Sequence, residues 1–156
     1  MHTDILQQIA DNLLDWMREN KSIERDTVFE DYHGFQIGNL SDDFVNQELQ
    51  PFHLTLDDVE VDFVKVSSDL KDQIHFHEGS AAYVYVLGFA EGFQEASGAI
   101  VYKNGTWVEV KSGESWLIEP YSVHGFSVEP GGILYFLSVQ SPPIVQGTKD
   151  DYHKVA

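Results

Sequence analysis

Short strand-like segments recur at regular intervals between residues 59 and 139, and the turns between them are rich in glycine and proline. They share a high content of apolar, β-branched and aromatic residues, and they cover residues 59–66, 82–87, 98–102, 106–110, 115–118, 125–128 and 133–139. Asn104-Gly105 is the strongest turn signal, because both residues readily adopt the positive φ angles of a two-residue hairpin. Regularly spaced short strands predict an all-β antiparallel sandwich or barrel.

One amphipathic helix is predicted ahead of these strands, over residues 3–20. Its apolar residues recur at three- and four-residue steps. They are Ile5, Leu6, Ile9, Leu13, Trp16 and Met17. The apolar face needs a cover, which is either the outside of the barrel or a second subunit. We therefore expect a helix within residues 1–24 and a barrel domain over residues 25–156, with the tail from residue 141 onward wrapped on the surface or partly loose.

The 156-residue chain is strongly acidic, with 26 acidic and 9 basic residues and a formal net charge of −17. Binding to nucleic acid or to an anionic membrane surface depends on lysine and arginine, so neither partner is expected. The N-terminus has no basic stretch followed by an apolar run, which predicts a cytoplasmic location. Because the chain has no cysteine, metal ligands would have to be histidine or carboxylate side chains.

Three of the seven histidines stand in a pattern that favours metal binding. His75 and His77 lie two residues apart beside a strand, so both side chains point to one face while Phe76 points to the other. Such a pair also occurs on solvent-exposed faces. Neutral imidazole is a good transition-metal ligand. A third histidine, His124, follows a proline and a tight turn, and with it the pattern favours a metal centre. The other four are interpreted as surface or linker residues: His2, His33, His53 and His153.

The order of these residues resembles the two motifs of the cupin family. Residues 70–88 resemble the first motif, a His-x-His pair followed by a strand that ends in glycine. Residues 113–126 resemble the second motif, in which a glycine, a short strand, a proline and a turn precede a histidine. The matching residues are His75, His77, Gly88, Gly113, Pro120, His124 and Phe126. The resemblance implies a double-stranded β-helix, or jelly-roll, barrel that binds one metal ion on its three motif histidines.

Both motifs depart from the family pattern. Ala81 and Ala82 stand where the first motif usually has a glutamate ligand, and Tyr121 and Ser122 replace the usual glycine of the second. Glu78 directly follows His77 and should point away from the shared face. Three neutral imidazoles leave the full charge of a divalent ion uncompensated, which favours an anionic, bidentate substrate. Fe(II) is the favoured ion, and Ni, Mn, Cu and Zn are alternatives.

The resemblance implies a metal-dependent dioxygenase that acts on a small organic acid or a diketone-like substrate. Two other interpretations stay open: a metal-assisted isomerase or lyase that needs no oxygen, and a non-catalytic cupin that binds a small molecule. The resemblance also implies a homodimer.

Five further residues are candidates for the site. Tyr83 and Tyr85 are the candidate catalytic residues, because their hydroxyls would orient substrate or donate a proton if their face of the strand points inward. Trp116, Phe126 and Gln140 are the candidate substrate-binding residues of the pocket wall. For all five the alternative is a role in the core.

Overall fold

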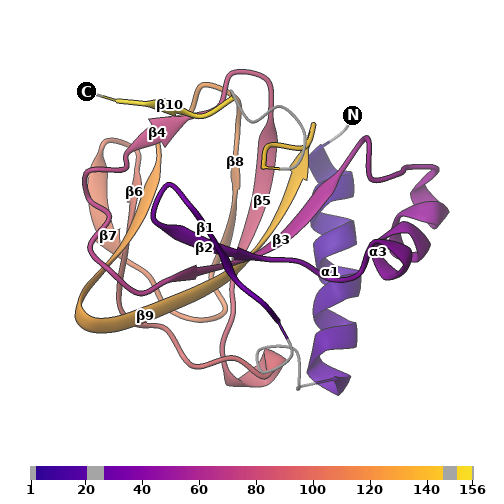
Figure 1. The fold of residues 1–156 in the computed structure, drawn as a ribbon, viewed down its shortest axis with the longest axis horizontal. Coiled ribbons are helices and arrows are strands. Elements are labelled where there is room, and N and C mark those ends of the chain that lie inside the picture. The colour runs from indigo at the N-terminus through magenta and orange to yellow at the C-terminus, as the bar shows by residue number, and fades with distance from the viewer. Residues whose placement is uncertain (1–2, 21–26, 146–150, 156) are drawn as a thin grey trace.

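The computed structural model describes residues 3–20, 27–145 and 151–155. Within these ranges the strands form an antiparallel barrel, and the helices lie on one side of it (Figure 1). The helices are α1 (Thr3–Glu19) and α3 (Asp42–Leu49), with short 3₁₀ helices at Gln50–Phe52 and Phe89–Glu91. The strands are β1 (Glu30–Tyr32), β2 (Phe35–Gly38), β3 (Glu60–Val66), β4 (His75–Phe76), β5 (Ala81–Val86), β6 (Ser97–Lys103), β7 (Thr106–Glu109), β8 (Ser115–Ile118), β9 (Gly125–Ser141) and β10 (His153–Lys154).

The largest sheet has the strand order β1-β2-β3-β9-β5-β8. β6 joins it through β9 and pairs with β7, while β4 and β10 form a separate two-stranded sheet. The pairings are antiparallel throughout the described strands. The predicted all-β barrel with an N-terminal helix is therefore confirmed.

Strand β9 differs from the sequence-based expectation. The sequence predicts two strands separated by a turn at residues 129–132, whereas the structure has one continuous strand of 17 residues. Its first part pairs with β6, and its second part lies between β3 and β5. The strand bends at Gly131, whose φ of +80° is a backbone conformation that residues other than glycine rarely adopt. Figure 1 shows the bent strand curving around one end of the barrel, so that a single strand pairs with β6 in its first part and with β3 and β5 in its second.

Local signals account well for two smaller elements. Asn104 and Gly105 have φ angles of 54° and 83°, as expected for the turn that joins β6 to β7. Helix α3 was not predicted, because its mixed pattern of polar and apolar residues gives no clear signal of a short helix. Its start is nevertheless marked by Ser41, whose hydroxyl oxygen accepts a hydrogen bond from the backbone N–H of Phe44.

Helix α1 packs against the outer face of the barrel. Leu6, Ile9 and Leu13 are buried, and they share a core cluster with Val61 and Phe63 of β3. A second core cluster is formed by the side chains on the other face of the same strands, inside the barrel. The central strands are therefore buried on both faces, and this arrangement decides which residues reach the interior.

Candidate metal centre

The three motif histidines meet inside the barrel. Their ligand nitrogens all lie within 4.8 Å of one another, and each residue is buried. His75 and His124 are opposite partners in an antiparallel bridge, with His75 N–H donating to the His124 carbonyl at 2.9 Å and the reverse bond at 2.8 Å. Opposite residues of such a pair project to the same side. His77, two residues after His75, projects to that side as well, so the predicted histidine cluster is confirmed.

Each imidazole is held by a hydrogen bond from its Nδ1 atom to a backbone carbonyl. The acceptor is Gln73 for His75 at 2.9 Å, Ser122 for His124 at 2.8 Å, and Asp151 for His77. A carbonyl only accepts, so Nδ1 carries the proton and Nε2 keeps its lone pair. A metal-binding histidine needs this tautomer, and its fixed orientation is typical of metal sites.

Burial keeps the three imidazoles neutral. Desolvation is the main cause that lowers the pKa of His75, His77 and His124, in the case of His124 to about 4. The charge that a protonated neighbour would carry lowers the pKa of His75 further. At neutral pH the cluster is therefore a set of three neutral nitrogen donors, which is the state that binds a transition metal.

The cluster forms part of the wall of a cavity that opens to solvent. Most of the remaining lining is apolar, and it comes from β2, β3, β5, β8 and β9. Phe35 and Phe126 stand with their rings edge-on to His75 and His124, at centroid distances of 5.9 and 6.1 Å. Such an apolar lining excludes much of the water from the histidines, while the cavity stays open to a small ligand.

Two of the three candidate pocket residues line this cavity. Phe126 and Gln140 both contribute to its wall. Trp116 does not: it stacks behind Phe126 at 6.3 Å, and the Lys103 ammonium lies 4.5 Å from the centre of its ring. Trp116 therefore supports a residue of the cavity wall from behind.

The placement expected for Tyr83 and Tyr85 is wrong. Both residues lie on the face of β5 that packs toward α1, and the Tyr83 hydroxyl donates to Ser115 Oγ at 2.8 Å. The opposite face of β5 presents Ala82 and Val84 to the cavity. Because both faces of the strand are buried, the alternation of side chains does not reveal which face is inside.

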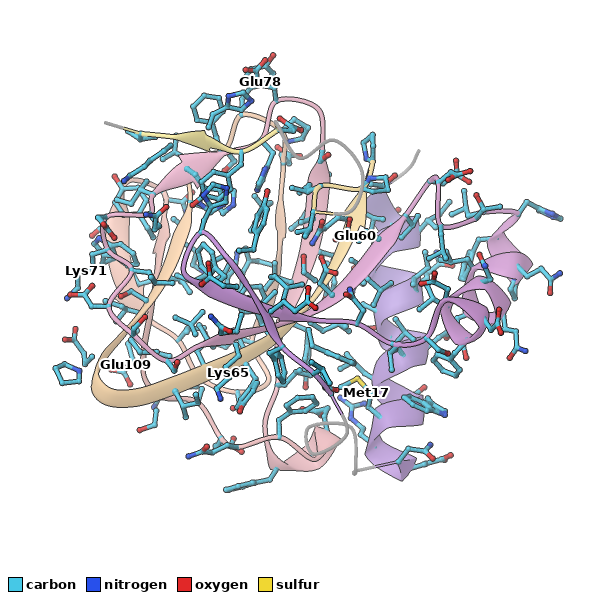
Figure 2. All side chains as sticks on the ribbon, in the orientation of Figure 1. Met17, Glu60, Lys65, Lys71, Glu78 and Glu109 are labelled. Carbon is cyan, nitrogen blue, oxygen red and sulfur yellow. The ribbon has the colours of Figure 1, made fainter. Side chains whose placement is uncertain are left out.

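No carboxylate joins the histidines in the described part of the chain. Ala82 lines the cavity with its methyl group. Glu78 projects outward (Figure 2), where its carboxylate lies 3.1 Å from His153 Nε2. The expectation that Glu78 points away from the cluster is confirmed.

Residues near the C-terminus complete the site, and they were not predicted from the sequence. Tyr152 stacks on His75 at a centroid distance of 4.1 Å, and His33 stacks on the other face of Tyr152 at 4.0 Å. Asp151 supplies the carbonyl that holds His77, while its carboxylate accepts the backbone N–H groups of Glu78 and Gly79 at 2.6 and 3.1 Å. Only the pairing of β10 with β4 brings these residues to the cluster, so no local pattern predicts them.

We expect Asp151→Ala to weaken metal binding by about tenfold, the lower end of the range for groups that orient a ligand. The substitution removes the carboxylate that anchors Asp151 to the loop after His77, so the carbonyl that orients His77 is held less firmly. Competition with a chromophoric chelator would measure the affinity. Asp11→Ala on the exposed face of α1 is the matched control and should leave it unchanged. Equal affinities for the two variants would contradict this role of Asp151.

Comparison with known proteins supports the fold. No family model matches the sequence, and a search of curated proteins finds no match either. Solved structures do match: the polyketide cyclase RemF from Streptomyces resistomycificus has 22% identity and a TM-score of 0.59, with 85% of this chain and 82% of that chain covered. Streptomyces Pac13, a nucleoside dehydratase, has 15% identity and a TM-score of 0.53, with 84% and 86% covered. KdgF from Halomonas sp. has 19% identity and a TM-score of 0.52, with 79% and 94% covered.

These similarities show the fold of the protein. The chain has the cupin fold, a β-barrel with one helix at its N-terminus, and its three motif histidines lie together as in a three-histidine metal site. Among the described helices, none combines the length and the apolar character needed to span a membrane.

Proposed function

We propose that this protein is a metal-dependent dioxygenase whose substrate is a small anionic or diketone-like molecule that chelates the metal. The observation that carries the proposal is the buried cluster of three neutral imidazoles in the wall of an apolar cavity, with each ring held by a backbone carbonyl. This donor set fits a divalent transition metal, because it offers three nitrogen ligands in the required tautomer.

His75, His77 and His124 would hold the ion, with Fe(II) favoured and Ni, Mn, Cu or Zn as alternatives. When bound, such an ion supplies Lewis-acid chemistry and, in the case of iron, redox chemistry. The chain contributes no negative ligand from its described residues, so an anionic substrate would meet an uncompensated positive charge. The net charge of −17 opposes this attraction at long range, but salt screens that effect beyond about 8 Å.

The cavity wall has its own part in the proposal. Phe35, Phe126 and Phe136 exclude water and restrict the orientation of a small substrate against the histidines. Tyr152 covers one face of His75 and closes the same side of the site. Substrate positioning of this kind is a large part of what a protein contributes to catalysis.

A redox-neutral lyase or isomerase is the second candidate, and a specific observation favours it. Glu60 and Asp62 form a buried carboxyl pair beside Gln140 of the cavity wall, and a pair of this kind can hold a proton for acid-base chemistry. The names of two structural neighbours, polyketide cyclase and nucleoside dehydratase, denote reactions without net oxidation. A homodimer and a cytoplasmic location stay predictions.

Oxygen uptake separates the candidates. Untagged protein loaded anaerobically with Fe(II) would be mixed with 2,4-pentanedione or 2-oxo acids in an oxygen-electrode cell. Oxygen uptake matched to loss of substrate, and absent in His124→Ala, is the expected result. Conversion of a substrate at constant oxygen would favour the lyase or isomerase. Metal-dependent binding without any conversion would leave a cupin that only binds.

A further inference from the structure

A polar cluster lies inside the barrel beside the apolar cavity. Glu60 and Asp62 of β3 stand opposite Gln140 and Ser138 of β9, and all four are at most 5% exposed. They project to the same face of β3 as Val64, which lines the cavity. Figure 2 shows Glu60 within the outline of the barrel. Four polar side chains on an inner face are costly to bury unless they are hydrogen-bonded.

Both amide hydrogens of Gln140 are already used. Its Nε2 atom donates to Asp62 Oδ2 at 2.9 Å and to Ser138 Oγ at 3.0 Å. Asn39 donates to the other oxygen of Asp62, so the carboxyl group is held from both sides. This network fixes the Gln140 amide with its nitrogen toward Asp62, and its oxygen is left for another partner.

Two buried polar atoms of the cavity wall have no hydrogen-bond partner among the described residues. One is Gln140 Oε1, and the other is the hydroxyl of Tyr32. Both residues line the cavity that contains the histidines. Burial, followed by the charges of Glu60, Asp151 and Asp62, raises the pKa of Tyr32, so its hydroxyl keeps its proton and can donate. Native proteins rarely leave such atoms unpaired, so a ligand group or ordered water is expected there.

We propose that Gln140 and Tyr32 form a polar subsite for the end of the substrate that does not bind the metal. The unpaired Gln140 oxygen accepts a hydrogen bond from a hydroxyl or an amide N–H of the substrate. The Tyr32 hydroxyl donates a hydrogen bond to an oxygen atom of the same end of the substrate. The substrate class is a small chelating acid that carries a hydroxyl or carboxamide group at its far end. The inference rests on the proposed function, because the other end of the molecule is taken to chelate a metal on the histidines.

Matched probes test the subsite. Hydroxypyruvate and 2-oxobutanoate share a chelating head and differ by a hydroxyl in place of a methyl group. Oxosuccinamate and 4-methyl-2-oxopentanoate differ by a carboxamide in place of an isopropyl group. Binding to Ni(II)-loaded protein would be measured by calorimetry, and the visible spectrum of the metal would report chelation. We expect the polar member of at least one pair to bind about tenfold more tightly, because the apolar isostere leaves Gln140 Oε1 unpaired.

Two variants complete the test. Gln140→Met keeps the length of the side chain and should abolish the preference for the polar probe, and Tyr32→Phe should reduce it. Removing a hydroxyl that has no hydrogen-bond partner in the described part of the chain should leave the melting temperature of the unliganded Tyr32→Phe protein unchanged or raise it. Equal affinities within both pairs, while the spectrum reports chelation, would overturn the subsite and leave the metal centre intact.

A failure of the proposed function gives a different result. If Ni(II) does not bind, or if no probe alters its spectrum, the chelating centre is contradicted. The melting temperature of Tyr32→Phe then tests whether the subsite exists. A fall of more than about 4 °C would show that the fold already satisfies the hydroxyl, and would overturn the inference. An unchanged or higher melting temperature would support it.

Discussion

His124→Ala should lose metal affinity by more than about 100-fold, since removal of a ligand exceeds the effect of removing a group that orients one. His124 is one of three nitrogen donors, and no described carboxylate stands nearby to replace it. Its loss leaves two ligands, His75 and His77, which is one fewer than catalytic metal sites usually have. Elemental analysis of untagged protein should find about one equivalent of metal in the wild type and almost none in the variant.

His53→Asn is the matched control for this experiment. His53 lies on the surface at the end of a 3₁₀ helix with a φ of 59°, a backbone conformation that asparagine tolerates well. The control should bind metal as the wild type does. Equal metal content in wild type and His124→Ala would remove the basis for a metal-dependent function, whatever the fold.

Glu60→Gln should reduce the pH dependence of stability. Burial, together with the hydrogen bond and charge of Glu60, raises the pKa of Asp62 well above its usual range. Between the pKa of the unfolded chain and this raised value, the native state holds a proton that the unfolded state has released. The contribution of this proton to the free energy of unfolding is therefore complete below the pKa of the unfolded chain. It falls by about 1.4 kcal/mol per pH unit as pH rises through this window. A neutral glutamine at position 60 removes the charge of Glu60 from these causes, while the burial of Asp62 remains.

Denaturant unfolding between pH 5 and pH 9 would measure the effect as a difference between variant and wild type. The difference is needed because the buried histidines have lowered pKa values, and they add stability as pH rises toward 6.5 in both proteins. We expect Glu60→Gln to become progressively more stable than the wild type as pH rises. Glu109→Gln, on an exposed position of β7, is the matched control and should follow the wild type. Parallel curves for wild type and Glu60→Gln would contradict the shared proton.

Local sequence patterns predicted much of the site. The spacing of His75 and His77 places them on one face of a strand regardless of what surrounds it. The β6–β7 turn at Asn104-Gly105 followed from the positive φ angles that these residues accept. The second-motif turn is less ordinary: Tyr121 adopts a φ of 66°, where glycine is usual, and its N–H donates to the His77 carbonyl at 2.7 Å. A residue type that departs from the family pattern thus still forms the turn.

Other parts of the site depended on contacts between distant segments. Asp151 and Tyr152 reach the histidines only because β10 pairs with β4, and the short tail carries no pattern that predicts this pairing. The bond between Gln140 and Asp62 likewise joins residues 78 positions apart. Such pairings depend on the register of β3 against β9, which the complete barrel decides.

Strand and helix periodicity were sufficient to predict an all-β sandwich or barrel and the N-terminal helix, because those features depend on neighbours a few residues apart. The resemblance to the two cupin motifs added the jelly-roll barrel and joined His124 to His75 and His77. The tertiary structure decided which face of each central strand is inside. In β5 that choice places Ala82 and Val84 at the cavity and sends Tyr83 and Tyr85 toward α1. The physical reason is that helix α1 buries the outer face as completely as the barrel buries the inner one, so both faces of the strand carry apolar side chains and the sequence pattern is the same for either orientation.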